Sequence, residues 1–213
     1  MLDFGFYNMD CIDGMKEFPD KYFDLAIVDP PYAINRFKNG QTSRLNKYGS
    51  FKTVNDLKPT KEWFEELQRV SKNQIVWGYN HLCDILPPTK EFIFWYKHQP
   101  VDTYSDGELA YTSFEKTAKC FDYPYFGGVN ADDIRIHPTQ KPVALYEWII
   151  SKYANEGDII LDTHVGSASS LIACRRTGHK FVGFEIDETY YKSAKARLDQ
   201  EMAQTTIFDF IEK

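Results

Sequence analysis

The chain has 213 residues, 43% of them hydrophobic and 16% aromatic, with a formal net charge of −6. A chain of this size can bury one substantial core, so we expect a single domain over residues 1–213. No segment resembles a signal peptide, and no apolar run approaches the roughly 20 residues that cross a bilayer, which argues against a membrane protein and favours the cytoplasm. The four cysteines form no C-x-x-C pair, so we expect neither a metal site nor a disulfide framework.

Seven segments have the length and the β-branched or aromatic content of strands. They are residues 4–9, 24–29, 74–77, 91–96, 108–114, 159–162 and 180–184. Helical patterns lie between several of them, at residues 61–71, 142–153, 167–177 and 188–204. Strands that alternate with helices predict an α/β fold with a mostly parallel sheet and helices on both faces.

The tetrapeptide Asp29-Pro30-Pro31-Tyr32 follows the buried strand predicted at residues 24–29. It therefore leaves the carboxyl end of that strand, where ligands of open α/β sheets bind. The two prolines stop the strand, and they leave the Pro30 carbonyl without an obligatory partner in the sheet. By itself the segment is also compatible with a plain turn whose aromatic side chain fills space.

The chemistry of this tetrapeptide suits an exocyclic amino group of adenine or cytosine. Such a nitrogen is a poor nucleophile because its lone pair is delocalised into the ring. Two acceptors, the Asp29 carboxylate and the Pro30 carbonyl, can hold its hydrogens and direct the lone pair at a methyl donor. Tyr32 can stack on the base, which must be flipped out of a duplex before it reacts. The segment thus predicts methyl transfer to a base without a metal.

Residues 159–167 read as a strand, a tight turn and the start of a helix. Gly166 lets the backbone approach a ligand closely, and Ser167 can cap the helix. Glu185 ends the next predicted strand, at the spacing of about 20 residues from the turn that ribose-binding acids keep in nucleoside-binding folds. Because the G-x-G-x-x-G pattern is absent, the turn favours an adenosine without phosphates over a dinucleotide.

Two irregular segments are interpreted as substrate-contact loops. In residues 33–58, basic side chains outnumber the single acidic one, Asp56. We expect this loop to bind DNA, with contacts from Arg36, Lys38, Arg44 and Lys47; the alternative is a solvated surface loop. Residues 115–136 are the part of the chain available for target recognition.

Together with His137-Pro138-Thr139-Gln140-Lys141-Pro142, these segments resemble the β-group DNA amino-methyltransferases, especially their compact phage or prophage members. In that group the catalytic motif precedes the glycine turn, as it does here. The resemblance implies a Rossmann-like sheet of seven mostly parallel strands, one of them antiparallel, with a circularly permuted motif order. It also implies S-adenosylmethionine as cofactor, DNA as partner and N6 of adenine as target, in a bacterial or phage-infected cell. A homodimer is one option.

The resemblance also implies a set of cofactor-binding residues. They are Asp10, Cys11, Thr139, Gln140, Lys141, Asp162, Thr163, Gly166, Ser167 and Glu185. Asp10 would contact the adenine ring, Glu185 would bind the ribose, and Lys141 would lie at the methionine end, where it suits a carboxylate. His137 is interpreted as a structural or gating residue rather than a general base.

The glycine turn departs from the family pattern. The family usually has Asp-Pro-Phe before a Gly-Ser-Gly turn, whereas this chain has Thr163, His164 and Ala168 in place of the proline, the phenylalanine and the last glycine. We expect a reshaped cofactor pocket. Cytosine N4 is the nearest alternative target, followed by RNA or protein glutamine. A non-catalytic cofactor- or DNA-binding module derived from such an enzyme is the alternative from another class.

Overall fold

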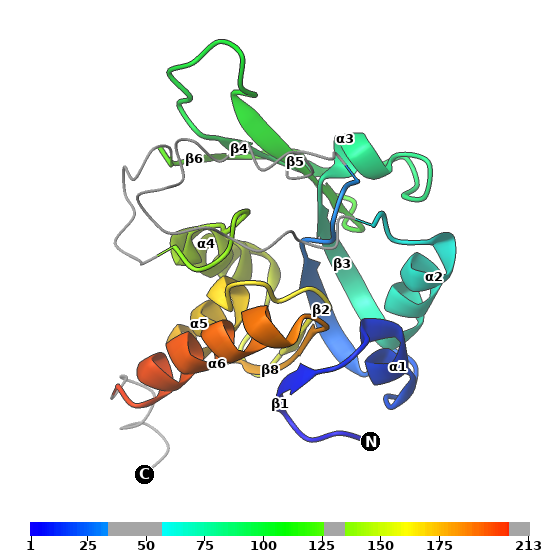
Figure 1. The fold of residues 1–213 in the computed structure, drawn as a ribbon. Helices are drawn as coiled ribbons and strands as arrows, with labels where there is room; N and C mark the ends of the chain where they lie inside the picture. The colour runs from blue at the N-terminus through cyan, green and yellow to red at the C-terminus, as the bar shows by residue number, and fades with distance from the viewer. Residues whose placement is uncertain (34–56, 126–134, 205–213) are drawn as a thin grey trace.

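The computed structural model describes residues 1–33, 57–125 and 135–204, and these residues form one eight-stranded sheet with helices on both faces (Figure 1). The strand order is β1-β8-β7-β2-β3-β5-β4-β6. The strands are β1 (Gly5–Asn8), β2 (Phe23–Val28), β3 (Ser71–Trp77), β4 (Phe92–Tyr96), β5 (Gly107–Thr112), β6 (Lys119–Asp122), β7 (Ile159–Asp162) and β8 (Lys180–Glu185). Every pairing is parallel except those of β5 with β3 and β4.

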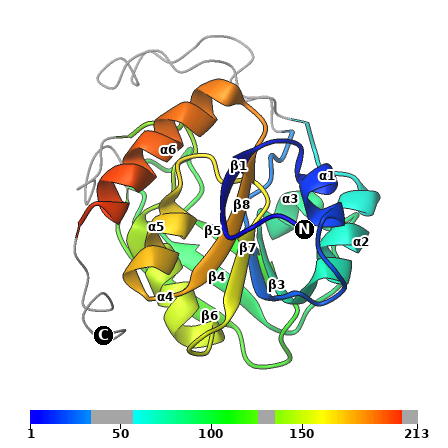
Figure 2. The same ribbon diagram turned by 90° about the horizontal axis from the view of Figure 1, so that it is seen from below.

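Helices cover both faces of the sheet, as Figures 1 and 2 show from two sides. One face carries α1 (Cys11–Lys16), α2 (Lys61–Val70) and α3 (Tyr79–Leu82). The other face carries α4 (Val143–Tyr153), α5 (Ser169–Arg176) and α6 (Glu188–Met202). Within the described residues, no helix is long and apolar enough to cross a membrane.

The central strand β2 is buried on both faces. Leu25 and Ile27 point into the core beneath α4 and α5, whereas Ala26 and Val28 point into the core beneath α1 and α2. All four side chains are almost wholly buried. A strand covered on both sides reads as a continuous apolar run, and this explains why residues 24–29 lack the polar alternation of a surface strand.

Polar side chains fix where several helices begin. Asp10 accepts hydrogen bonds from the backbone N–H groups of Ile12 and Asp13 and so starts α1. Thr60 caps α2 through the N–H of Trp63, and Asp187 caps α6 in the same way. Each cap satisfies donors that the first helical turn leaves unpaired.

The predicted α/β class is confirmed, and so is the single antiparallel strand, which is β5. The predicted number of strands was one too low, because the four-residue β6 lies inside the segment 115–136 that was read as irregular and pairs parallel with β4. Helices α1 and α3 were also missed. A helix of four to six residues is too short to show a helical period in the sequence.

Candidate active site

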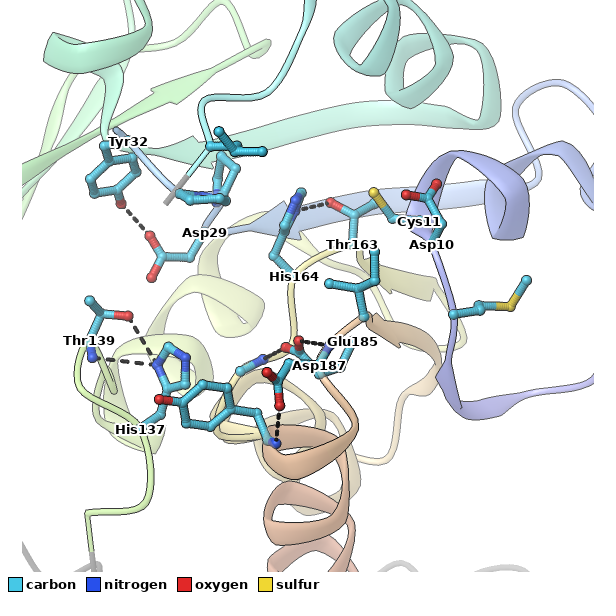
Figure 3. Close-up of a pocket in the computed structure, with 17 residues that line it drawn as sticks. Asp10, Cys11, Asp29, Tyr32, His137, Thr139, Thr163, His164, Glu185 and Asp187 are labelled. Carbon is cyan, nitrogen blue, oxygen red and sulfur yellow. Dashed lines mark hydrogen bonds between the residues drawn. The ribbon is translucent and has the colours of Figure 1, made fainter. Parts of the chain in front are cut away.

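The predicted catalytic and cofactor segments meet at one pocket, at the carboxyl ends of neighbouring parallel strands (Figure 3). Asp10 follows β1, Asp29 follows β2, Thr163 follows β7, and Glu185 ends β8. Parallel strands present their carboxyl ends at the same edge of a sheet, so residues far apart in the chain are brought together there. In Figure 3, Asp29 and Tyr32 lie at one end of the pocket and Asp10 and Cys11 at the other.

At the Asp29 end, the carboxylate is held by two donors from different parts of the chain. The Tyr32 hydroxyl donates to Oδ1, and the Lys141 ammonium lies 2.5 Å from Oδ2. The Tyr32 ring stacks on His81, with 5.3 Å between ring centroids and 16° between planes. Burial, together with the charge of Asp29, raises the pKa of Tyr32 well above its ordinary value, so the phenol remains a hydrogen-bond donor.

Pro30 directly follows Asp29 in the chain and also lines the pocket, and its carbonyl is the second acceptor expected from the sequence. Among the described residues, no hydrogen-bond donor reaches it. Two neighbouring residues at the carboxyl end of β2 thus each offer the pocket an acceptor, a carboxylate and a carbonyl. An amino group with two hydrogens fits this pair of acceptors.

At the opposite end, Glu185 joins two backbone segments. Its Oε2 accepts a hydrogen bond of 3.0 Å from the N–H of Gly166, and its Oε1 accepts one of 2.9 Å from the N–H of Asp187. Burial raises the pKa of Glu185, while these backbone donors oppose the rise. Asp10 is exposed at the pocket rim, where its carboxylate also caps α1. Both carboxylates can accept hydrogen bonds from hydroxyl or amino groups of a ligand.

Asp162 holds the turn in place through hydrogen bonds, although it does not line the pocket. It is almost wholly buried and accepts hydrogen bonds from the Ser170 hydroxyl at 2.5 Å and from the N–H of His164 at 2.9 Å. Burial raises its pKa to about 7, and the nearby charges of Asp29 and Glu185 act in the same direction. Its contacts are with the turn itself, since Asp162 is not among the residues that line the pocket.

Ala168 stands where the family usually has a glycine, yet its backbone has the left-handed conformation that glycine adopts easily. Ala168 has φ 64°, in the left-handed region, and Gly166 has φ 55°. The N–H of Ala168 donates to the carbonyl of Val165, and its own carbonyl accepts from Ile172 at the start of α5. An alanine in this conformation costs about 1–2 kcal/mol relative to a right-handed one. The surrounding turn therefore imposes a shape that the missing glycine would adopt without strain.

One expectation about this turn was wrong. Ser167 does not cap α5, because the cap position is Ala168, which has no side-chain acceptor. The Ser167 hydroxyl instead lies 3.1 Å from that of Ser169. Burial leaves Ser167 only 4% exposed, and its carbonyl accepts a hydrogen bond of 2.6 Å from Arg197 on α6.

The structure brings most of the predicted site residues to the pocket. Those that line it are Asp10, Cys11, Asp29, Pro30, Pro31, Tyr32, Thr139, Thr163, Gly166 and Glu185. Gln140, Lys141, Asp162 and Ser167 lie behind its wall and are buried. The predicted DNA contacts Arg36, Lys38, Arg44 and Lys47 lie outside the described residues.

Several lining residues were not assigned to the cofactor site from the sequence. They are Met9, Leu57, His137, His164, Ile186, Asp187 and Tyr190. Ile186 and Asp187 directly follow Glu185, so their place after a predicted strand end was the signal that could have found them. The same signal applied to His164, which follows Thr163 in the predicted turn, and His137 begins the motif that supplied Thr139.

Both pocket histidines are held in the neutral form. Burial lowers the pKa of His137 to about 4, with further effects from Lys141 and Arg135, and its ring packs edge-on against Tyr190 at 4.4 Å. Burial also lowers the pKa of His164 to about 4. His164 Nδ1 lies 2.9 Å from the Thr163 hydroxyl, and its ring packs edge-on against Trp63.

Solved methyltransferases share this arrangement of sheet and helices. The structure of M1.HpyAVI with S-adenosylmethionine aligns with 90% of this chain and 98% of its own, at a TM-score of 0.62 and 23% identity. The cytosine-N4-specific PvuII DNA methyltransferase aligns with 91% of this chain and 85% of its own, at a TM-score of 0.59 and 16% identity. These likenesses confirm the methyltransferase fold expected from the resemblance.

Sequence comparison defines the family. The type II methyltransferase M.HpaI of Haemophilus parainfluenzae is 29% identical over 90% of this chain and 73% of its own length. The type II methyltransferase M2.MboI of Moraxella bovis is 27% identical over 92% and 87%. The family model described as DNA methylase matches residues 72–196, which is more than half of the chain. The chain therefore belongs to the N6/N4 DNA methylase family.

Proposed function

We propose that this protein transfers a methyl group from S-adenosylmethionine to the N6 amino group of adenine in DNA. The observation that carries the proposal is the pair of acceptors at the carboxyl end of β2, the Asp29 carboxylate and the Pro30 carbonyl, in the same pocket as Glu185. One end of the pocket suits an amino group, and the other suits a nucleoside. Family membership supports DNA as the substrate.

The cofactor end has the donors, acceptors and apolar surface that S-adenosylmethionine requires. Asp10 and Glu185 offer carboxylates to the adenine amino group and the ribose hydroxyls, and Met9, Ile186 and Tyr190 offer apolar surface to the adenine ring. The neutral rings of His137 and His164 add no positive charge that would repel a sulfonium. When bound, the cofactor supplies an electrophilic methyl group on that sulfonium.

The role proposed for the chain is to make the base amino group nucleophilic. Asp29 and Pro30 accept its two hydrogens, so its lone pair turns out of conjugation and toward the methyl carbon. The nitrogen–carbon bond forms as the sulfur–carbon bond breaks, and the proton lost from nitrogen passes to Asp29 or to water. Tyr32 holds the flipped base by stacking on it.

Adenine is preferred over cytosine because the motif begins with aspartate. In the family that the chain resembles, Asp-Pro-Pro-Tyr favours adenine and Ser-Pro-Pro-Tyr favours cytosine. Cytosine N4 is the second candidate, and the fold similarity to the cytosine-N4-specific PvuII enzyme is the observation in its favour. Residues 33–58 are proposed to contact the DNA backbone, and residues 115–136 to take part in target recognition.

The test is to incubate the purified protein with labelled S-adenosylmethionine and genomic DNA that lacks both modifications, and to identify the product by nucleoside mass spectrometry. We expect labelled N6-methyladenine from the wild-type protein and none from Asp29→Ala, with cofactor binding retained in that variant. Labelled N4-methylcytosine would support the second candidate. Absence of any methylated nucleoside would reject catalysis on DNA.

A further inference from the structure

Four side chains of alternating charge form a connected cluster behind the catalytic end of the pocket. The Lys141 ammonium lies 2.5 Å from Asp29 Oδ2 and 3.0 Å from Glu108 Oε2. Lys97 pairs with the other oxygen of Glu108. The cluster thus links Asp29 to a strand on the other side of β3, because Glu108 lies on β5 and Lys97 follows β4.

Lys141 is the member of this cluster that lies deepest. Its side chain is 4% exposed, and its ammonium also faces the rings of Trp77 at 5.5 Å and Tyr32 at 6.0 Å. Burial alone favours the neutral amine, but the carboxylates of Asp29 and Glu108 raise the pKa of Lys141 above its ordinary value. The buried cation is retained only because two anions are held against it.

Glu108 is charged for the same reason. Burial acts to raise its pKa, yet Lys141 and Lys97 together lower it to about 2. The cluster thus pairs two acidic side chains with two basic ones, so its formal charges balance. Removing one member leaves an uncompensated charge, whereas removing Lys141 and Glu108 together leaves Asp29 and Lys97 and keeps the charge balanced.

We propose that Lys141 is a positioning residue for Asp29, and that Glu108 in turn positions Lys141. This inference rests on the proposed function. Tyr32 and Lys141 donate hydrogen bonds to different oxygens of the Asp29 carboxylate. Together these two bonds restrict rotation of the carboxylate about its Cβ–Cγ bond. The remaining lone pairs stay directed at the place where the substrate amino group must lie. The resemblance to the family suggested instead that Lys141 binds the methionine carboxylate.

The decisive variant is the double substitution Lys141→Met with Glu108→Gln, because it removes one cation and one anion together; besides the contact with Asp29, it removes the ion pair of Glu108 with Lys97. We expect it to fold, to bind S-adenosylmethionine in calorimetry within a few-fold of wild type, and to lose about 100-fold in kcat, the size of loss that misplacement by about 1 Å can cause. Glu108→Gln alone retains the pair of Lys141 with Asp29, so its loss should be smaller. Arg176→Met with Glu201→Gln removes a more exposed ion pair between α5 and α6 and serves as the control for the loss of one cation and one anion.

Two outcomes would overturn the inference. Near-wild-type kcat in the double variant would mean that Lys141 only neutralises Glu108, and a large loss of cofactor affinity would mean that Lys141 binds the cofactor. If the wild-type protein methylates no DNA, the proposed function is rejected but the positioning role of Lys141 is not. A crystal structure of the double variant tests the positioning role in that case too. We expect the Asp29 carboxylate to leave its place beside the Tyr32 hydroxyl, and an unmoved carboxylate would refute the positioning role.

Discussion

The backbone of Gly78 lies directly against the ring of Tyr32, so closely that a Cβ atom on residue 78 would overlap the ring. Gly78 also has φ 78°, a conformation that glycine adopts easily. The Tyr32 ring therefore occupies a slot with Gly78 on its wall and His81 stacked against it. Gly78 lies between β3 and α3, and His81 belongs to α3 itself.

Gly78→Ala should displace Tyr32 and lower methylation by about 10- to 100-fold without changing cofactor affinity, because the slot lies at the base end of the pocket. The left-handed backbone adds a stability cost of about 1–2 kcal/mol. Gly157→Ala is a matched control, since Gly157 has φ 85° but no atom within 4 Å of the added Cβ. Equal activity in both variants would show that only backbone strain matters at residue 78.

Glu185→Gln should weaken the binding of S-adenosylmethionine. The carboxylate holds the N–H groups of Gly166 and Asp187, and a neutral amide gives weaker hydrogen bonds to them and to ribose hydroxyls. We expect a loss of about 1.5–3 kcal/mol, measured by calorimetry, because hydrogen bonds to charged groups fall in that range. Glu188→Gln, which removes an exposed carboxylate at the start of α6, should bind normally. Equal affinity in the two variants would contradict the assignment of Glu185 to the cofactor.

The stability of the protein should depend on pH through His164. Its pKa is about 4 in the folded protein and 6.5 ordinarily, so between these values the unfolded chain binds the extra proton and stability falls as the pH falls. His164→Phe removes this contribution to the pH dependence of stability. Relative to wild type, the free energy of unfolding of the variant should improve by about 1.4 kcal/mol per pH unit as the pH is lowered through this window.

Asp162 should act in the opposite direction, which provides an internal control. Its pKa rises from 3.8 to about 7 on folding, so it contributes stability at low pH that is lost as the pH rises through 7. Asp162→Asn should therefore make the free energy of unfolding fall more steeply as the pH is lowered. His164→Phe should make it fall less steeply. Urea unfolding from pH 4.5 to 7 measures both, and slopes that change in the same direction would refute the assignment.

The basic residues of segment 33–58 should control the salt dependence of DNA binding. Replacing Arg36, Lys38, Arg44 and Lys47 with alanine should make the slope of log affinity against log salt shallower by about 0.9 for each phosphate contact removed. Cofactor affinity should not change. Replacing four exposed lysines elsewhere, Lys16, Lys61, Lys192 and Lys195, controls for net charge, and an unchanged slope in the first variant would rule out the DNA-contact loop.

The sequence predicted the part of the site that depends on strand ends. Asp29, Thr163 and Glu185 each follow or end an apolar run, and the parallel arrangement alone brings such positions to one edge of the sheet. The sheet was predictable because its long central strands have clear patterns. The four residues of β6 carry only one buried side chain, Phe121, and give too weak a pattern to recognise.

The cluster behind Asp29 could not be predicted in the same way. Lys141 belongs to a recognisable motif, but the sequence does not say which carboxylate its ammonium meets. That choice follows from the packing of the segment before α4 against β5, which places Glu108 and Asp29 on either side of one amine. Side-chain partners that depend on tertiary packing leave no periodic signal in the chain.

The position of β2 between β3 and β7 has a consequence for synthesis on the ribosome. Its neighbour β3 follows soon in the chain, whereas β7 is translated only after β4, β5, β6 and α4. Until then, one edge of the apolar strand that precedes Asp29 has no native partner and is open to pairing with other chains. The nascent protein is therefore exposed to aggregation during most of its elongation, and the active-site pocket closes only when Glu185 has emerged and β8 has joined β7 to β1.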